Sequence, residues 1–240
     1  MWLSRRQVGG IARQAGALVF PERCVSCGRF GALLCLACAA RMEPATGPGR
    51  CPNCSARWTK PLNCHLCAAW DSRLLDGGRA AFEMAGPARH LVHALKYGGV
   101  RAAARPMAAR MLPLWQPGQF DAAIPVPLHR ARRRARGFNQ AEVLLRELGW
   151  PLAPGRLVRV RKTKTQVGLH ARERRANVQG AFTYHGPPLD GLSLALVDDV
   201  ITTGATANEC AGLLRDHGAR RVVVVAFARA THEKESIPVD

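Results

Sequence analysis

Aromatic residues, lysine and acidic residues are all scarce in this sequence of 240 residues. Aromatic side chains make up 6% of the chain, which counts against a surface built to stack unpaired bases. No run of about 18 consecutive apolar residues occurs, so a hydrophobic transmembrane helix is excluded. The opening segment MWLSRRQVGGIARQAGALVF contains scattered arginines and lacks the continuous apolar stretch of a secretory signal. We therefore expect a cytoplasmic protein without membrane insertion.

The scarcity of acids leaves the chain strongly basic, with 17 Asp and Glu against 35 Lys and Arg and a formal net charge of +18. Only 5 of these cations are lysines, and 30 are arginines. Arginine suits the recognition of phosphate and carboxylate groups. Because Ala and Gly are abundant too, compositional drift is an equal explanation for the preference for arginine. The sign of the net charge nevertheless indicates an anionic partner.

Cysteine is abundant, and eight of the nine cysteines form four CxxC pairs before residue 70. In a reducing compartment clustered cysteines are more often metal ligands than disulfides, although a single CxxC is also typical of a redox pair. Two pairs supply the four thiolates of a tetrahedral zinc site, and such a closed site is structural. We expect two structural zinc ions, held by Cys24, Cys27, Cys35, Cys38, Cys51, Cys54, Cys64 and Cys67.

The spacing of these pairs leaves their arrangement open. The intervals of seven, twelve and nine residues between them allow sequential or interleaved pairing. His65 lies inside the last pair and could replace a thiolate. A module this small needs the roughly 10 to 16 kcal/mol that structural zinc supplies per site, so chelation is expected to unfold it. The ninth cysteine, Cys210, is expected to be a small buried apolar residue.

Composition divides the chain into an N-terminal helix and cysteine module (1–70), a second domain (71–232) and a tail (233–240). The hydrophobic content of 48% is enough for a buried core. From residue 121 onward, short β-rich apolar runs alternate with helical stretches, which is typical of an α/β fold with a parallel sheet. Helices are expected over 3–19, 138–150 and 205–218, with two helical pieces over 87–114; strands are expected over 121–127, 155–160, 181–185, 192–200 and 219–229.

The most specific segment is LALVDDVITTGAT, at 194–206. A buried strand leads to two adjacent acids and a short apolar step, and Thr-Thr-Gly-Ala-Thr then opens a helix. The N–H groups of a helix N-terminus bind phosphate, and Gly204 permits close approach. Asp198 and Asp199 would repel a phosphate unless they have another task, such as hydrogen-bonding ribose hydroxyls with Mg²⁺ nearby. The plain alternative is a strand that ends in solvated acids before a capped helix.

This segment resembles the ribose-phosphate fingerprint of type I phosphoribosyltransferases. The resemblance implies a type I phosphoribosyltransferase-like parallel sheet flanked by helices. It also implies that the two acids take the ribose hydroxyls of phosphoribosyl pyrophosphate (PRPP), which binds with Mg²⁺, and that the Thr-Gly loop holds its 5′-phosphate. The residues that it assigns to PRPP binding are Asp198, Asp199, Thr202, Thr203, Gly204, Ala205, Thr206, Pro127, Leu128 and Arg130.

Segments 124–141 and 159–182, with LKYGG at 95–99 and the cysteine module, narrow the resemblance. Together they make the chain similar to the ComF/GntX family, whose members join an N-terminal double zinc ribbon to a phosphoribosyltransferase-like domain. Some members are linked to DNA uptake in competence. The resemblance covers nearly the whole chain, and the partners that it implies are PRPP, single-stranded DNA and the competence DNA-uptake machinery.

Two arginine-rich segments hold much of the remaining charge. Residues 130–136 contain five arginines after the strand whose end receives pyrophosphate in a type I fold, although a solvated face is an equal alternative for 132–136. Residues 161–179 correspond, in the family comparison, to a mobile loop that closes over PRPP. A cationic lid stabilises the charge on departing pyrophosphate and excludes water. Lys164 and Arg172 are therefore candidate catalytic residues beside Asp198 and Asp199.

Two functions are compatible with these features. The first is a Mg²⁺-dependent transferase that moves ribose 5-phosphate from PRPP to a nucleophile, with inversion at C1 and loss of pyrophosphate. No general base is visible, so the acceptor is unassigned. The second is a non-catalytic PRPP sensor or a single-stranded DNA-binding protein that uses zinc ribbons and arginine loops. The sequence favours a PRPP-binding, phosphoribosyltransferase-like protein that serves DNA uptake or handling.

Overall fold

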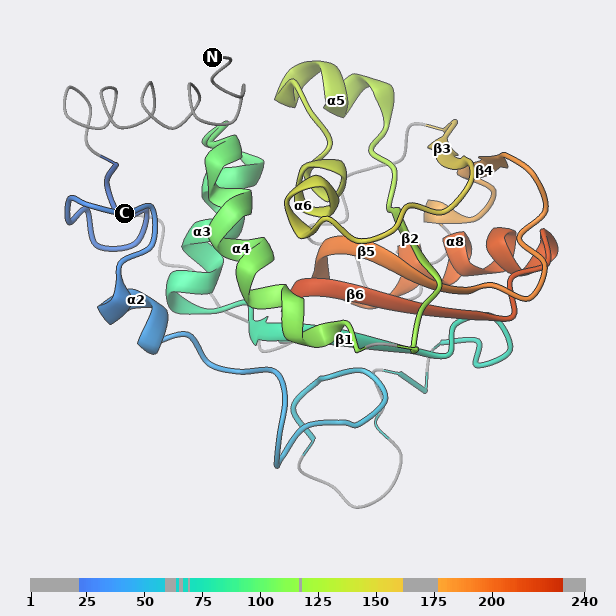
Figure 1. Ribbon diagram of the computed structural model, residues 1–240, viewed down its shortest axis with the longest axis horizontal. Coiled ribbons are helices and arrows are strands. Elements are labelled where there is room, and N and C mark those ends of the chain that lie inside the picture. Colours follow the sequence, from blue (N-terminus) through green and yellow to red (C-terminus); the bar gives the residue numbers. More distant parts are fainter. Residues whose placement is uncertain are drawn as a thin grey trace, which may run out of the picture.

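The computed structural model describes residues 22–58, 64, 67–68, 70–116, 118–161 and 177–230 (Figure 1). The helix expected over 3–19, the tail 233–240 and His65 lie outside the described residues. Lys164 and Arg172 also lie outside them, because most of the segment 161–179 does. Within the described ranges, no helix combines the length and the hydrophobicity that crossing a bilayer requires.

Four parallel strands form the central sheet, in the order β1-β6-β5-β2. They are β1 (Gly77–Glu83), β2 (Ala122–Pro125), β5 (Ser193–Ile201) and β6 (Arg221–Arg229). The two central strands, β5 and β6, are near-continuous apolar runs and are buried along most of their length. Such runs are expected where helices cover both faces of a strand. The parallel α/β sheet predicted from the sequence is confirmed.

Helices cover both faces of this sheet (Figure 1). Side chains alternate along β6, so that Val223, Val225 and Phe227 face one helical layer whereas Val222 and Val224 face the other. The first layer contains α3 (Gly86–Lys96), α4 (Ala104–Met111) and α6 (Gln140–Leu148), with 3₁₀ turns at Arg101–Ala103 and Leu112–Leu114; the second contains α8 (Ala205–Asp216). The sheet is therefore the middle of three layers.

Local capping groups set the ends of α6. The side chain of Asn139 accepts a hydrogen bond from the N–H of Ala141 at 3.1 Å, as expected of an N-cap residue. Its amide also donates to the carbonyl of Val126 at 3.0 Å, which ties the helix to the end of β2. At the other end, Gly149 adopts a left-handed conformation with φ 65° and stops the helix.

The sequence does not predict β1. Its residues, GGRAAFE, are rich in Gly and Ala and contain none of the β-branched residues by which strands are recognised. The strand forms because β6 pairs with it along its length, from Gly77 opposite Val223 to Glu83 opposite Arg229. Tertiary pairing therefore overrides the weak local preference.

Two other segments differ from their expected arrangement. The strands β3 (Arg156–Arg159) and β4 (Phe182–His185) do not join the parallel sheet, because they pair antiparallel with each other in a separate ribbon. Only one side of this ribbon is buried, on the α8 side of the sheet. Residues 130–136, for which no helix was expected, form the short helix α5 (Arg130–Arg136), which is capped by the side chain of His129.

The cysteine segments lie on different sides of the sheet. The first, which includes α2 (Leu36–Ala40), packs with α3 and α4, and the second, residues 50–58, lies along the free edge of β1. The N–H of Gly78 donates to the carbonyl of Asn53 at 2.7 Å, and the N–H of Ala80 donates to Oγ of Ser55 at 3.2 Å. An uncovered edge strand can pair with other chains, so this segment protects the sheet.

A buried carboxylate fixes the same segment at the end of β1. The side chain of Glu83 is 3% exposed, and it accepts hydrogen bonds from Nε of Arg57 at 2.6 Å and from Arg50. The two arginines pair in a short antiparallel bridge around the CxxC turn between them. Glu43, which is half-exposed, contacts both arginines from the other side. Two acids and two arginines therefore join the cysteine segment to the sheet.

We expect Glu83→Gln to lower the free energy of unfolding by about 3 kcal/mol or more, because it removes the buried counter-charge of Arg50. The control is Glu142→Gln, which breaks an exposed pair with Arg133 of 3.0 Å and is expected to cost less than about 1 kcal/mol. Urea unfolding of the metal-loaded protein measures both variants. Equal losses would show that the Glu83 network is no stronger than a surface pair.

Candidate functional site

The connection between β5 and α8 turns sharply at Gly204. β5 ends at Ile201 and α8 begins at Ala205, with Gly204 as the N-cap residue at φ 79°. This left-handed conformation favours glycine. A side chain is also excluded by space, because a Cβ at this position would lie 2.2 Å from Nε1 of Trp70. The turn directs the N-terminal N–H groups and the positive dipole end of α8 toward a cavity.

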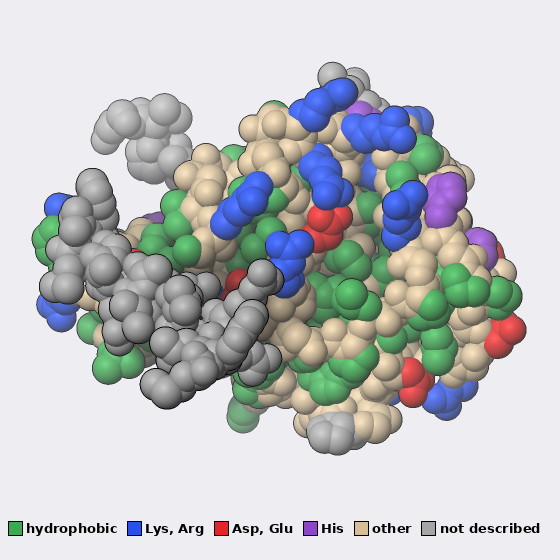
Figure 2. Space-filling model, turned by 45° about the horizontal axis from the view of Figure 1, so that its top comes forward, with side chains coloured by type: hydrophobic (Ala, Val, Ile, Leu, Met, Phe, Trp, Pro, Cys, Tyr) green, Lys and Arg blue, Asp and Glu red, His purple; other side chains and the backbone are tan. Residues whose placement is uncertain are grey.

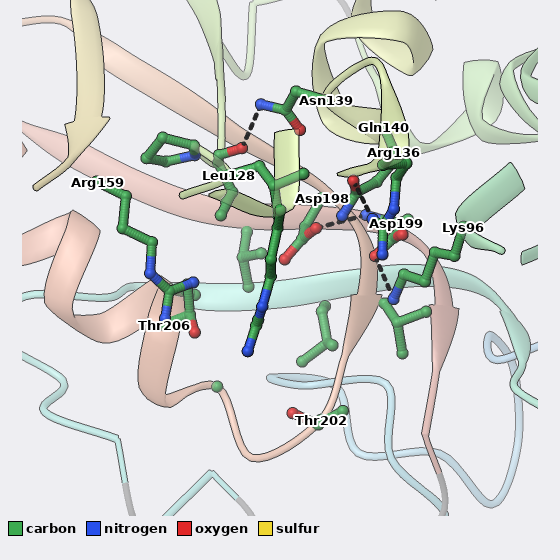
Figure 3. A pocket seen from close by; sticks show the side chains of 18 of the residues that line it. Lys96, Leu128, Arg136, Asn139, Gln140, Arg159, Asp198, Asp199, Thr202 and Thr206 are labelled. Carbon is green, nitrogen blue, oxygen red and sulfur yellow. Dashed lines mark hydrogen bonds and ion pairs between the residues drawn. The ribbon is translucent and has the colours of Figure 1, made fainter. Parts of the chain in front are cut away.

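This cavity, of about 260 Å³, opens where β2 and β5 end. The carboxyl edge of a parallel sheet is the usual place for ligands in α/β folds. Most of the residues that the sequence assigns to PRPP line it, and Figure 3 shows several of them. Those that line it are Pro127, Leu128, Asp198, Asp199, Thr202, Gly204 and Thr206.

Three residues of the expected set do not line the cavity. Thr203 is buried, and its carbonyl accepts a hydrogen bond from Nε1 of Trp70 at 2.7 Å. Ala205 is buried at the start of α8. Arg130 is exposed at the start of α5, whereas Arg132 and Arg136 of the same helix line the cavity, because residues four apart share a helix face.

The two adjacent acids meet a lysine from a distant helix. Asp199 has a side chain that is 2% exposed, and its Oδ1 lies 2.9 Å from Nζ of Lys96 at the end of α3 (Figure 3). The other carboxylate oxygen, Oδ2, is buried and has no hydrogen-bond partner in the described part of the chain. A buried acceptor without a donor is costly, so this oxygen is suited to a hydroxyl group or a cation brought by a ligand.

The surroundings of Asp198 favour its protonated form. Burial, followed by the negative charge of Asp199, raises the pKa of Asp198 to about 8. Burial opposes the charge of Lys96, but the two carboxylates outweigh it and raise the pKa of Lys96. At neutral pH, Asp198 therefore carries a proton beside an ion pair of Lys96 and Asp199. A strongly shifted carboxyl group in a cavity is characteristic of a functional site.

Arginines surround this acidic centre. Arg132 and Arg136 reach the cavity from α5, and Arg159 reaches it from β3. Figure 3 shows Arg159 directed toward Thr206, across the cavity from Lys96. In the space-filling view, Lys and Arg side chains gather on the upper part of this face, around one acidic patch (Figure 2). The cavity therefore fits a ligand that carries several negative charges.

Sequence reasoning missed four of these cations in their roles. Lys96 belongs to LKYGG, which the sequence singles out only by resemblance, and nothing local connects it to acids about a hundred residues later. Arg159 reaches the cavity only because β3 leaves the sheet. A signal did exist for Arg132 and Arg136, since their spacing of four residues places them on one face once the segment is helical.

The paired cysteines form two groups of four, in sequential order along the chain. In each group the four sulfur atoms lie within 4.8 Å of one another, and neighbouring sulfurs are 3.6 to 3.7 Å apart. A tetrahedral zinc ion with Zn–S bonds of about 2.3 Å places its sulfurs ~3.8 Å apart. The first cluster is Cys24, Cys27, Cys35 and Cys38, and the second cluster is Cys51, Cys54, Cys64 and Cys67.

Each cluster begins with a tight turn around a CxxC pair. The N–H of Gly28 donates to the carbonyl of Cys24 at 2.8 Å, and the N–H of Ser55 donates to that of Cys51 at 2.9 Å. Gly28 and Ser55 adopt left-handed conformations, with φ of 74° and 59°. The turns therefore place both sulfurs of each pair on one side, as a shared ion requires.

An arginine lies against each cluster. Nη2 of Arg41 donates to Sγ of Cys38 at 3.3 Å. Arg229 is 1% exposed and lies near enough to the second cluster for its cysteines to act on the arginine charge. Within the described ranges, its Nε and Nη2 have no hydrogen-bond partner. A buried cation needs a counter-charge, and four thiolates around a divalent ion carry a net negative charge. The residues of both clusters therefore fit a metal such as zinc.

Curated proteins include clear relatives of this chain. It is 43% identical over 116 residues to competence protein F of Haemophilus influenzae, a match that covers 46% of this chain and 51% of that protein. It is 41% identical over 113 residues to the DNA utilization protein YhgH of Salmonella typhi, covering 45% and 49%. At 25% identity, a match of 194 residues covers 77% of this chain and 79% of competence protein ComFC of Bacillus subtilis. The chain spans about half the length of the first two relatives.

No family model matches the sequence. Among solved structures, the chain is similar to a hypoxanthine phosphoribosyltransferase from Staphylococcus aureus, with 10% identity, a TM-score of 0.32 and coverage of 57% of this chain and 76% of that chain. It is also similar to phosphoribosylpyrophosphate synthetase from Mycobacterium smegmatis, with 22% identity, a TM-score of 0.31 and coverage of 53% and 33%.

We expect Lys96→Met to destabilise the protein more at pH 9 than at pH 6.5. The pKa of Asp198 is raised from 3.8 to about 8, so the folded chain holds a proton there at pH 6.5 and loses it above pH 8. Without the lysine, the carboxylates of Asp198 and Asp199 would repel each other at pH 9, with no cation beside Asp199 to offset that repulsion. The loss of unfolding free energy should therefore grow by about 1.4 kcal/mol per pH unit above 8.

Urea unfolding at the two pH values measures this difference. Arg110→Met is the matched control, because it also removes a cation from a helix. The Arg110 guanidinium donates to the backbone carbonyl of Pro106 at 2.9 Å, and a carbonyl does not change its charge with pH. Its effect should be the same at both pH values. If Lys96→Met likewise cost the same at pH 6.5 and pH 9, the lysine would not be controlling the charge of the acid pair.

Proposed function

We propose that the chain is a member of the family of competence protein F and the DNA utilization protein YhgH, and that its cavity binds PRPP together with Mg²⁺. In this proposal it is a phosphoribosyltransferase-like protein that serves DNA uptake or handling. The names of its relatives indicate the process, and the groups that line the cavity indicate the ligand. The observation that carries the proposal is that two adjacent carboxyl groups and the N-terminal turn of α8 line one cavity.

The cavity offers a different set of groups to each part of PRPP. The turn 202–206 presents backbone N–H groups and threonine hydroxyls, which suit the 5′-phosphate. Asp198 and Asp199 suit the ribose hydroxyls, since Oδ2 of Asp199 lacks a donor in the described part of the chain. Residues 127–128, with Arg132 and Arg136 beyond them, suit the pyrophosphate. Bound Mg²⁺ would neutralise part of the pyrophosphate charge.

Phosphoribosyl transfer is the reaction that this arrangement suits. The electron pair of a nucleophile forms a bond to C1 of the ribose on the face opposite the pyrophosphate. The C1–O bond breaks, and its electron pair leaves with the pyrophosphate. Arg132, Arg136 and Arg159 are positioned to stabilise the negative charge on that group. Lys164 and Arg172, outside the described residues, are proposed to approach the same group from the segment 161–179.

The two cysteine clusters are proposed to hold two structural zinc ions. Four thiolates complete the coordination of each ion and leave no position for a substrate. Each cluster also closes a stretch of chain whose described residues contain little regular secondary structure. The zinc ions would therefore stabilise the fold, and the chemistry would be confined to the cavity.

Single-stranded DNA is a second candidate ligand, and the charge of the chain favours it. The net charge is +18, and α5 presents exposed arginines beside the cavity, including Arg130 and Arg134. A phosphate backbone binds such a surface by releasing counterions. Tyr97, which is 69% exposed and lines the cavity, offers one aromatic face. The two functions are compatible, because a DNA strand could lie across α5 while PRPP occupies the cavity.

We expect calorimetric titration to detect binding of PRPP in the presence of Mg²⁺. The double variant Asp198→Asn/Asp199→Asn should bind at least about 100-fold more weakly, because it loses charge-assisted hydrogen bonds to the ribose. The control is Asp216→Asn, an exposed acid at the far end of α8, which should bind like the parent protein. Circular dichroism checks that all three proteins are folded. The absence of binding to the parent protein would refute the proposal.

The affinity for PRPP should also depend on pH. The pKa of Asp198 is about 8, and the ligand is proposed to bind the ionised carboxylate. Below pH 8 a proton must therefore leave on binding, and the affinity should rise by about tenfold per pH unit up to that value. A flat profile between pH 6 and pH 8 would show that Asp198 does not contact the ligand in its ionised form.

We expect binding of a fluorescent oligo-dT strand to weaken steeply between about 50 and 200 mM salt. The variant Arg130→Gln/Arg134→Gln should reduce the slope of log affinity against log salt by about 1.4, since each phosphate contact on single strands contributes about 0.7. Glu142→Gln on α6 is the control, because it removes a negative charge instead of positive charges, and it should not reduce the slope. Salt-independent binding, or an unchanged slope in the double arginine variant, would exclude α5 as the DNA surface.

A further inference from the structure

The second cluster lies directly against the turn that begins α8. Trp70 follows its last ligand by three residues, and the N–H of Trp70 donates to the carbonyl of Cys67 at 2.9 Å. The indole Nε1 donates in turn to the carbonyl of Thr203 at 2.7 Å. The ring also fills the space where a side chain at position 204 would be. One residue therefore connects the backbone of the cluster to the backbone of the turn.

Arg229 makes a second connection, through its charge. It is the last residue of β6 and is 1% exposed. Its Nη1 donates to the carbonyls of Ile201, at 2.9 Å, and Thr202, where β5 leads into the turn. Cys54, Cys64 and Cys67 of the second cluster lie near enough to act on the charge of its guanidinium. The guanidinium is thus held between the cluster and the turn.

The counter-charge of Arg229 depends on the metal. A divalent ion keeps four cysteines as thiolates, so the loaded cluster carries a net negative charge beside the buried guanidinium. When the ion is removed, this counter-charge is lost while the arginine remains buried. A buried cation without a partner is unfavourable, and the contacts that hold it are expected to rearrange. The carbonyls of Ile201 and Thr202 are among those contacts.

The first cluster provides a comparison within the same chain. Its arginine, Arg41, contacts Cys38 in a similar way, at 3.3 Å. This cluster packs on the opposite face of the sheet, with α3 and α4, where Ser26 hydrogen-bonds to His90 at 3.1 Å. Among the described residues, none of its hydrogen bonds reaches 201–206. Metal at the first cluster therefore has no comparable path to the turn.

We propose that Trp70 and Arg229 are positioning residues that make the conformation of the turn 201–206 depend on metal at the second cluster, but not at the first. Metal loss from the second cluster would then release the turn and weaken whatever anion binds there. The proposal requires metal binding by both clusters, and it does not require that the ligand of the cavity be PRPP.

Hydrogen–deuterium exchange of the full chain tests this coupling without any ligand. Cys54→Ser/Cys64→Ser removes ligands from the second cluster, and Cys24→Ser/Cys27→Ser does the same for the first. Zinc analysis should find one ion per chain fewer in each variant than in the parent protein. Amides of 201–206 should exchange at least about tenfold faster in the second-cluster variant and at the parental rate in the first-cluster variant. Equal exchange in the two variants, or parent protein without zinc, would overturn the proposal.

Variants that retain all eight ligands separate coupling from general unfolding. Trp70→Phe keeps an aromatic ring at this position but removes the N–H group that donates to Thr203. Zinc retention should therefore be unchanged, while the amides of the turn exchange faster. Arg229→Gln should lower the zinc affinity of the second cluster by about 10- to 100-fold, as expected for a residue that contacts metal ligands, and should also release the turn. Arg229→Lys restores the charge and should recover most of the zinc affinity.

Arg41→Gln is the matched control. It should lower zinc affinity at the first cluster and leave the exchange of 201–206 unchanged. If Trp70→Phe and Arg229→Gln also left that exchange unchanged, neither residue would be coupling the cluster to the turn. Because no readout uses PRPP, a protein that shows the coupling but does not bind PRPP would refute only the proposed function. A protein that binds PRPP with a turn insensitive to metal would refute only this inference.

Discussion

Two carboxyl groups that lie side by side at the end of a buried strand repel each other, and the site is organised around that repulsion. Lys96 offsets the charge of Asp199, which requires α3 to end beside β5 even though α3 follows β1, a strand that β6 separates from β5 in the sheet. Asp198 then keeps its proton at neutral pH. The arginines of α5 and β3 stand farther out, so the cavity attracts anions while its floor remains close to neutral. The cavity therefore presents groups of opposite sign within one small space.

Much of the fold is predictable from local sequence because its signals are strong and periodic. The valine and leucine runs of β5 and β6 predict buried parallel strands, and both form. Asparagine is a favoured N-cap residue, and Asn139 caps α6 through contacts within one turn. Four CxxC pairs predict two sites of four sulfurs, and the structure resolves their order as sequential. Most of the residues at 198–206 that were expected at the cavity do line it.

The remaining features depend on contacts between distant parts of the chain. β1 is composed mainly of Gly and Ala and becomes a strand only beside β6. Lys96 and Arg159 gain their roles from the packing of α3 and from the departure of β3 from the sheet. Arg229 looks from sequence like the polar end of a strand, yet it is among the most deeply buried side chains. Burial of a cation of this kind follows from where a partner charge lies in space, which local patterns do not encode.

The two cysteine clusters differ in how readily another protein module could replace them. Ser55 adopts a left-handed backbone where the equivalent position of the first cluster has Gly28, and its hydroxyl accepts a hydrogen bond from β1. Serine at such a position costs conformational free energy that glycine would avoid. The hydrogen bond from β1 to the Ser55 hydroxyl offsets this cost, so the turn that contains Ser55 is part of the sheet edge. A protein engineer could replace the first cluster with another small module that fits α3, whereas grafting a foreign module in place of the second would require a new edge for the sheet itself.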